Sequence, residues 1–300
     1  MKQKNLVKKA LFPAIIALLC SFVALTSVSY AWFTMGSTAT LQEMDLKVTT
    51  SEGLQISTTG DAGTYKSTIS LTDLQADGTN NEFPAEVNPV STIGKIVNGN
   101  QNMFKGSVTD GKLTSATAGE DYIVFDLYIQ SSKEYGLIID TDSYVKSAND
   151  KATEGTGQTH LASRVSFVDL GSAAKIADAK ALGTDVDGTA TIWEPNSTKR
   201  STGAINQGDQ SDGSNVAYKG LKATFNGILL EDLGDSETAE VSTIKDSDLA
   251  TTPVVDLEAG YNKIRVYIWL EGQDVDCVNE IAGGTLKIKL NFKVIEVQKQ

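Results

Sequence analysis

The chain has 300 residues, with 26 lysines and arginines against 38 aspartates and glutamates, a net charge of −12 at pH 7. This acidic balance argues against nucleic acid and anionic lipid surfaces as partners, because both would repel the protein. The length suffices for one large domain with its own packed core.

The first 31 residues have the layout of a secretory signal peptide. Four lysines, at positions 2, 4, 8 and 9, precede an apolar run over residues 10–28, and Ser29 and Ala31 are the small residues expected at positions −3 and −1 of a cleavage site. We therefore predict that a signal peptidase cleaves between Ala31 and Trp32, and that the protein is extracellular or lies at the cell surface. Cleavage leaves 22 basic residues against 38 acidic ones, a net charge of −16.

The alternative is that the leader is retained as a membrane anchor. Residues 10–28 number 19, which is enough to span a bilayer as a helix. The lysines would stay inside, so residues 32–300 would still lie outside the membrane. Residues 10–28 would then be the only part of the chain in the membrane. After cleavage, by contrast, Cys277 is the only cysteine, so stability must come from a packed core and not from an intrachain disulfide.

Alternating apolar and polar residues predict β-strands along most of the exported part. Such alternation is typical of antiparallel strands with one buried and one outward face. The predicted strands, in chain order, are Met44–Thr50, Leu54–Thr58, Ser67–Leu71, Tyr122–Gln130, Gly136–Ile139, Arg164–Asp169, Ala190–Glu194, Leu221–Leu230, Lys263–Leu270 and Leu286–Val294. One helix is predicted at Ala173–Leu182, and long polar loops at 140–162 and 195–220.

This pattern predicts an all-β fold: an antiparallel β-sandwich, jelly-roll-like, with one short helix and long polar loops. We expect a single domain over residues 32–300. A second, smaller domain is the alternative.

The sequence offers little that could support catalysis. His160 is the only histidine, and neither a zinc-protease motif nor a nucleotide-binding fingerprint is present. A Ser-His-Asp triad would have to use His160, which is better explained as a solvated loop residue. Cys277 is better explained as a buried structural thiol. We predict that the protein is not an enzyme and has no cofactor; a secreted hydrolase built on acidic loops is the weaker alternative.

Acidic loops leave one possibility for a metal ion. Glu271, Asp274, Asp276 and Glu280 lie close together in a single loop, and carboxylate oxygens are the ligands that calcium prefers. The order of residues is not that of an EF-hand, and a solvated acidic loop explains the same pattern. Asp185 and Asp187, which precede a glycine, are a second candidate, with an ordinary hairpin turn as the alternative.

The leader junction carries a family resemblance. The run Ala-Leu-Thr-Ser-Val-Ser-Tyr-Ala-Trp-Phe-Thr at residues 24–34, followed by the predicted strand Met44–Thr50, resembles the start of TasA/camelysin-type surface proteins of Firmicutes. The segments 125–128, 192–196 and 269–272 are similar to exported proteins of clostridial bacteria that share this start. The resemblance implies a leader cut by a dedicated signal peptidase and a jelly-roll-like domain that assembles into biofilm fibres of a Gram-positive cell.

The chain departs from that family in two respects. Trp32-Phe33-Thr34 stands where the family often has Ala-Phe, and the chain is longer than many members. The resemblance is specific only at the leader, and no functional residues transfer from it. The metalloprotease activity described for camelysin does not carry over, because the chain has no recognisable zinc site.

An extended N-terminal segment offers a physical route to fibres. Residues 32–50 would add as a strand to the edge of a neighbouring copy's sheet, a head-to-tail contact that propagates without closing. The predicted assembly residues are Trp32, Phe33 and Met35 as anchors, continued by Met44, Leu46 and Val48. In the simpler alternative, residues 41–50 are the domain's own first strand and residues 32–40 are a tether.

A second functional class is a membrane-tethered adhesin or carbohydrate-binding module. Its outward aromatic residues would be Trp193, Tyr267 and Trp269, stacking on sugars. Cross-strand packing is the more common role of such aromatic residues.

Overall fold

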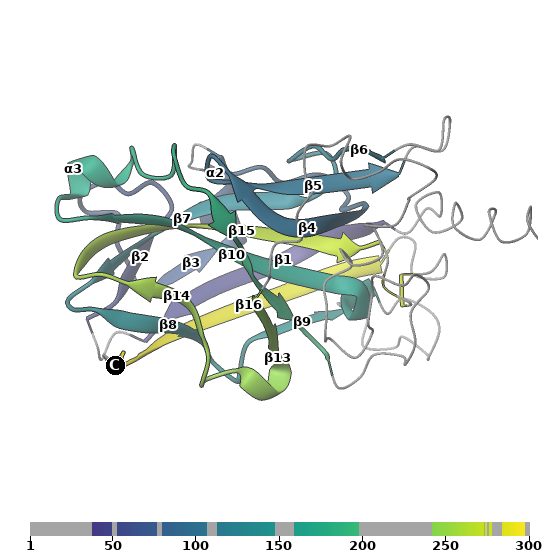
Figure 1. The fold of residues 1–300 in the computed structure, drawn as a ribbon. Helices are drawn as coiled ribbons and strands as arrows, with labels where there is room; N and C mark the ends of the chain where they lie inside the picture. Colours follow the sequence, from purple (N-terminus) through teal and green to yellow (C-terminus); the bar gives the residue numbers. More distant parts are fainter. Residues whose placement is uncertain are drawn as a thin grey trace, which may run out of the picture.

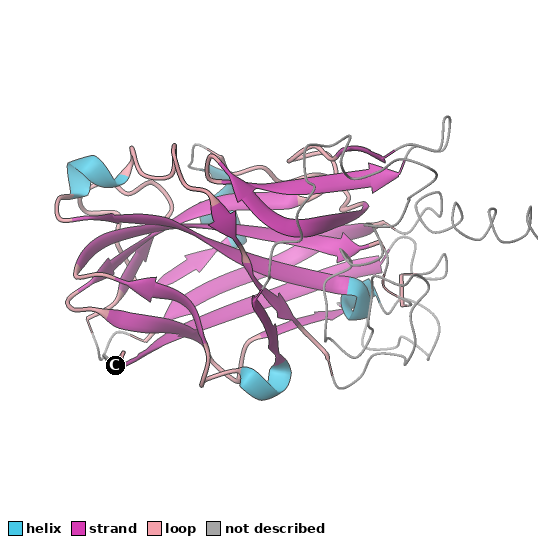
Figure 2. Cartoon of the chain, viewed as in Figure 1, coloured by secondary structure: helices cyan, strands magenta, loops and turns pink. Residues whose placement is uncertain are grey.

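The computed structural model describes residues 38–49, 53–76, 80–106, 113–147, 159–197, 242–272, 274, 276–277 and 284–297. This part of the chain is an all-β, sandwich-like structure, as the sequence predicts, and it has two short α-helices where the sequence predicts one (Figures 1 and 2). The leader and the predicted strand Leu221–Leu230 lie outside the described residues. Within those residues, no helix has the length and apolar character needed to cross a membrane.

The strands belong to two sheets, and most of them are labelled in Figure 1. The strands are β1 (Ala39–Val48), β2 (Gln55–Ser57), β3 (Thr68–Ser70), β4 (Pro89–Val97), β5 (Asn100–Gly106), β6 (Leu113–Ser115), β7 (Ile123–Ser131), β8 (Tyr135–Ile139), β9 (Tyr144–Ser147), β10 (Ser163–Ala173), β11 (Gly188–Thr189), β12 (Thr191–Glu194), β13 (Ser242–Lys245), β14 (Pro253–Leu257), β15 (Gly260–Glu271) and β16 (Gly284–Ile295). The helices are α2 (Leu71–Ala76) and α3 (Ile176–Ala179), with 3-10 turns η2 (Thr159–Ala162) and η4 (Asp246–Asp248).

The smaller sheet has the order β14-β8-β16-β1-β3, with β9 also paired to β16. The larger sheet runs β13-β12-β10-β15-β4-β5-β6; β7 also pairs with β15, β2 pairs with β7, and β11 pairs with β4. Most neighbours are antiparallel. Three pairs are parallel, namely β1 with β16, β12 with β13, and β4 with the end of β15. The antiparallel pairing that the sequence predicts is thus found for most neighbours. Strand β1 is an exception, because it joins β16 in parallel from the other end of the described sequence.

The main core lies between the two sheets. Alternate residues of β16 (Leu286, Ile288, Leu290 and Phe292) pack there, as the sequence predicts, together with Ile264, Val266, Ile268 and Leu270 of β15. The intervening lysines of β16 lie on the outer face, where Lys287 pairs with Glu43 at 3.0 Å. The period-two pattern thus correctly identifies the inner face of both strands.

A second core covers the opposite face of β15. Strands β4 and β5 fold over it, and Met103 and Phe104 of β5 pack against Tyr267 and Trp269 in one apolar cluster (Figure 1). Trp269 is 0 % exposed and Tyr267 is 2 % exposed. The prediction that these aromatic residues face outward is therefore wrong, because a hairpin absent from the strand predictions covers them.

The hairpin that joins β4 to β5 turns at Asn98 and Gly99. Both residues have positive φ angles, 50° and 74°, which is the geometry of a tight two-residue turn. A Cβ atom at Gly99 would collide with the carbonyl oxygen of Gly183, so the position requires glycine. The Asn-Gly dipeptide is a strong hairpin signal and marks the turn that the strand predictions missed.

The predicted helix and one predicted loop also differ from the structure. Helix α3 covers only Ile176–Ala179, because β10 continues through Ala173, which pairs with Tyr261 of β15. The polar segment 140–162 contains strand β9, which pairs with β16 and buries Val145 in the main core. Pairing with a neighbouring strand outweighs local composition in both places.

Candidate functional site

Strand β1 lies between β16 and β3 and pairs with both. We call this position the seat of β1. Nine Cα pairs, from Ala39 with Gly284 to Val48 with Phe292, join β1 to β16 in parallel. On its other side, three residues of β1 pair with the short strand β3. The seat therefore combines a long main-chain ladder with a short one.

The seat is apolar inside and charged outside. Met44, Leu46 and Val48, three of the predicted assembly residues, are at most 1 % exposed and belong to the main core. Asp45 and Lys47 alternate with them and are exposed. This alternation defines the register, because a slip by one residue would bury the charged side chains.

The remaining predicted assembly residues lie outside the described residues. These are Trp32, Phe33 and Met35, and the same holds for the predicted cleavage site between Ala31 and Trp32. The structure seats β1 in its own chain. Exchange of β1 between copies stays a prediction.

The predicted calcium loop contains a buried ion pair. The Nη2 atom of Arg164 donates to Oδ2 of Asp274 at 2.6 Å, and both side chains are fully buried. Glu271, also fully buried, accepts a hydrogen bond from the indole N–H of Trp269 at 3.2 Å. The backbone N–H of Asp276 donates to the other oxygen of Asp274 at 2.9 Å.

Arg164 also approaches a second carboxylate, since its Nε lies 3.5 Å from Oε1 of the buried Glu194. Within the described residues, no group of three or more His, Cys, Asp or Glu side chains is placed to hold a metal ion. Glu280 lies outside the described residues, and calcium at this loop stays a prediction. Arg164 is 110 residues from Asp274 in sequence, so no local pattern indicates this pair.

The second acidic candidate, Asp185 and Asp187, lies in a turn that contacts the turn of the β4–β5 hairpin. The Oδ1 atom of Asp187 accepts a hydrogen bond from the backbone N–H of Asn98 at 2.8 Å, and the N–H of Gly99 donates to the carbonyl of Val186 at 2.6 Å. Asp185 is exposed. The observed contacts are those of turn residues holding the β4–β5 hairpin in place.

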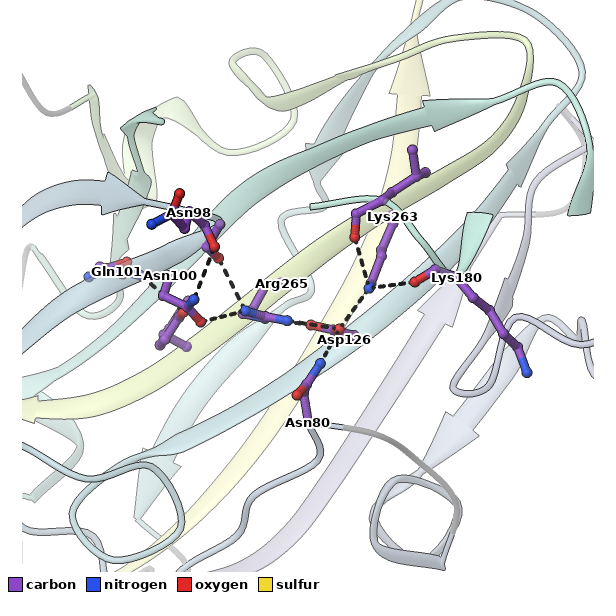
Figure 3. Close-up of polar contacts among 11 residues, drawn as sticks. Asn80, Asn98, Asn100, Gln101, Asp126, Lys180, Lys263 and Arg265 are labelled. Atoms are coloured by element: carbon purple, nitrogen blue, oxygen red, sulfur yellow. Dashed lines mark hydrogen bonds and ion pairs between the residues drawn. The ribbon is translucent and has the colours of Figure 1, made fainter. Parts of the chain in front are cut away.

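A buried polar network surrounds Asp126 beneath the same hairpin (Figure 3). Arg265 binds both carboxylate oxygens of Asp126, and Lys263 Nζ lies 3.2 Å from Oδ2. Asn80 donates to Oδ2 at 3.0 Å. Arg265 also donates to the side chain of Asn100 at 2.6 Å and to the carbonyl of Gly99, which ties the hairpin to β15.

The surroundings of Arg265 favour its charged form. Burial alone would lower the pKa of Arg265, but the hydrogen bond and attraction from Asp126 outweigh burial and raise it above its ordinary value. Both oxygens of Asp126 are engaged by cationic donors. The geometry therefore suits a structural clamp that joins β7, β15 and the β4–β5 hairpin.

The single histidine lies in a 3-10 turn, and Cys277 lies in a small buried cluster. His160 lies in the 3-10 turn η2, where its carbonyl accepts a hydrogen bond from the hydroxyl of Ser163 at 2.6 Å. Cys277 is fully buried and packs against Ala162.

The third aromatic residue proposed for sugar stacking is also buried. Trp193 is 1 % exposed and donates from its indole N–H to Oδ1 of Asp246 at 3.3 Å. The prediction that Trp193 presents an outward ring is therefore wrong. Trp193 instead helps to line a pocket of about 240 Å³ formed by the turn before β9, the end of β12 and the turn η4.

Comparisons with protein-family models, curated proteins and solved structures found no match. Among the described residues, the seat of β1, the buried ionic clusters and the pocket beside Trp193 are the features described above. Of these, the seat contains residues that the sequence marks for assembly.

Proposed function

We propose that the chain is an exported structural protein of a Gram-positive cell surface or biofilm matrix, of the TasA/camelysin type. In this proposal it self-assembles into fibres by exchange of its N-terminal strand. The observation that carries the proposal is the seat of β1 between β16 and β3. Export is supported by the signal-peptide layout of residues 1–31.

The topology of the seat suits exchange. Parallel neighbours cannot be joined by a tight hairpin, and β1 and β16 come from opposite ends of the described sequence. The seat therefore does not depend on a short connection between the two strands. A β1 strand from another copy would offer the same side chains and the same main-chain groups in the same register.

The buried side chains of β1 would supply the apolar contact between two copies. Burying a Met, Leu or Val side chain stabilises a fold by about 1.5–3 kcal/mol. Met44, Leu46 and Val48 together contribute roughly 5–9 kcal/mol on this scale. In an exchanged assembly, the same three side chains would pack into the core of the neighbouring copy. The interface therefore needs no apolar surface beyond the one that β1 already fills.

The geometry of such an exchange favours a filament. Each copy donates one strand and accepts one, with different surfaces used for the two roles. Such a head-to-tail contact is heterologous and propagates unless the rotation between copies closes a ring. The connection between β1 and β2 would be the hinge, because it joins the donated strand to the rest of its own chain.

A pair of cysteines can test the exchange directly. Glu43 of β1 is the register partner of Lys287 of β16, and the two side chains meet on the outer face of the sheet. One protein carries Glu43→Cys and a second carries Lys287→Cys, and both are secreted in the same culture. If β1 is exchanged, a disulfide links the two proteins, because neighbouring strands bring paired Cα atoms within disulfide range.

The matched control shares one of these substitutions. Lys146 of β9 is the register partner of Lys287 on the other side of β16. Strand β9 lies in the middle of the chain and is not a terminal strand that a copy could donate. The pair Lys146→Cys with Lys287→Cys should give no linked heterodimer. Equal cross-linking in both mixtures, or none in the Glu43 mixture, would contradict strand exchange.

Fibre formation is a separate question, answered on the secreted protein itself. N-terminal sequencing should give Trp32 as the first residue, and negative-stain electron microscopy should show filaments. Deleting residues 32–40 should abolish filaments. An intact leader in the membrane fraction without filaments would favour a tethered adhesin instead.

A further inference from the structure

Residues 80–88, which we call the strap, connect the two sheets along the edge of β1 that faces away from β16. Glu82 exchanges two main-chain hydrogen bonds with Val124 of β7, at 2.8 and 3.1 Å. Val87 exchanges two with Ala39, the first residue of β1, at 3.0 and 2.6 Å. Strand β7 belongs to the larger sheet and β1 to the smaller one, so the strap fixes the start of β1 to the opposite sheet.

The strap is anchored on both sides of Val87. Before it, the ring of Phe83 stacks on Phe125 of β7, with the ring centroids 6.1 Å apart and the planes 10° apart. After it, Asn88 donates from its backbone N–H to the carbonyl oxygen of Asp121 at 2.8 Å and from its side-chain amide to Oδ1 at 3.3 Å. Because both anchors lie at or just before β7, the strap cannot move away from β1 without losing one of them.

Strand β1 is paired unequally along its two edges. Nine Cα pairs join it to β16, whereas on the other edge β3 pairs with residues 45–47, near the end of β1. At the start of the strand the pair with Val87 holds Ala39, and both side chains are fully buried in the main core. In the cleaved protein, residues 32–38 alone would precede Ala39. A strand that leaves from this free end must therefore break the pair with Val87 before it withdraws the rest of its apolar face.

We propose that the strap is a latch: it retains β1 in the seat of its own chain, and opening of the Ala39–Val87 pair limits the rate of strand exchange. This inference rests on the proposed function. In an exchanged assembly, Val87 of the accepting copy would pair with Ala39 of the donated strand, so both states contain the same contacts. The latch therefore slows the conversion between the two states without favouring either.

Asn88→Ala loosens one anchor of the strap without altering β1. It removes side-chain hydrogen bonds to the carbonyl of Glu120 and to the carboxylate of Asp121. Hydrogen–deuterium exchange of the dilute secreted protein, measured by mass spectrometry, reports opening of β1. Exchange over residues 39–48 should become about tenfold faster, the effect of losing a hydrogen bond to a charged group.

Asn100→Ala is the matched control in the β4–β5 hairpin. It also removes one hydrogen bond to a main-chain carbonyl, that of Asn98, and one to a charged side chain, that of Arg265. It should leave exchange over residues 39–48 unchanged. Equal acceleration by Asn88→Ala and Asn100→Ala, or no acceleration by Asn88→Ala, would overturn the latch, because β1 would then open without regard to the strap.

The rate of strand exchange is measured with the proteins that carry Glu43→Cys and Lys287→Cys. They are purified, mixed under reducing conditions and oxidised briefly after increasing times. With Asn88→Ala in both, the linked heterodimer should form about tenfold faster and reach the same final yield. An unchanged rate, although β1 opens faster, would overturn the latch. If no mixture gives a heterodimer while β1 still opens faster, strand exchange is contradicted and retention of β1 by the strap is supported.

A disulfide makes the opposite change. Ala39→Cys with Val87→Cys places two cysteines in a hydrogen-bonded antiparallel pair, in which Cα atoms are about 5.5 Å apart and within disulfide range. The oxidised monomer should form no filaments, and reduction should restore them. Gln55→Cys with Gln130→Cys, register partners on β2 and β7, is the control and should form filaments in both states. Filaments from the oxidised Ala39→Cys, Val87→Cys monomer at the rate of its reduced form would overturn the proposal.

Discussion

Arg265 holds Asp126 through two nitrogen atoms, with Nε 2.6 Å from Oδ1 and Nη2 3.1 Å from Oδ2. Asp126 is 1 % exposed and Arg265 is 9 % exposed, so this ion pair is largely removed from water. The same guanidinium reaches the turn of the β4–β5 hairpin (Figure 3). One buried pair thus links the central sheet to the hairpin that covers it.

Replacing Asp126 with alanine should lower the free energy of unfolding by about 3–5 kcal/mol. The change leaves Arg265 and Lys263 buried without their carboxylate. Urea denaturation monitored by circular dichroism measures the loss. Asp61→Ala is the control, because Asp61 pairs with Lys180 at the surface, where an ion pair contributes little to stability. Equal losses in both variants would contradict a structural role for the buried pair.

Strand β1 allows a comparison of adjacent residues. Leu46→Ala should destabilise the protein by about 2–5 kcal/mol, because it opens a cavity in the main core. Lys47→Ala, one residue further on, should change stability by less than about 0.5 kcal/mol, because Lys47 is exposed. Urea denaturation at the same protein concentration measures both variants. Reversed effects would mean that β1 has the opposite register.

Alkaline pH should destabilise the fold through two buried tyrosines. Burial raises the pKa of Tyr122 and of Tyr128 to about 12 from the ordinary value of 10. The unfolded chain loses these protons first, so this contribution to stability is complete below pH 10 and is lost between pH 10 and pH 12. Ultraviolet absorbance of tyrosinate should show titration steps near pH 12 that Tyr122→Phe and Tyr128→Phe each reduce. Titration of all tyrosines near pH 10 in the folded protein would exclude this burial.

Arg164 should be required for the stability of a second buried cluster, which it forms with Asp274 and Glu194. Arg164→Met keeps much of the side-chain volume but removes the cation beside Asp274 and Glu194, and should cost about 3–5 kcal/mol. Lys289→Met is the control, because Lys289 pairs with the exposed Asp142 and should cost less than about 1 kcal/mol. The midpoint of urea denaturation compares the two. A cost below that of the control would indicate that the carboxylates are protonated in the folded protein.

Local sequence patterns identified one of the two buried faces of β15 and missed the other. The alternation over residues 263–270 correctly places Ile264, Val266, Ile268 and Leu270 in the main core. It cannot reveal that Arg265 and Trp269, on the opposite face, are also buried. Their burial depends on β4 and β5, which lie more than 150 residues earlier in the chain.

The sequence by itself determined that the described part is all-β, because side chains alternate with a period of two along most strands. It also identified the apolar face of β1, through Met44, Leu46 and Val48. Only the tertiary structure decided that β1 lies parallel to β16 and that Arg164 pairs with Asp274. Such partners are selected by the packing of distant segments, whereas periodicity reports only which side of a strand is apolar.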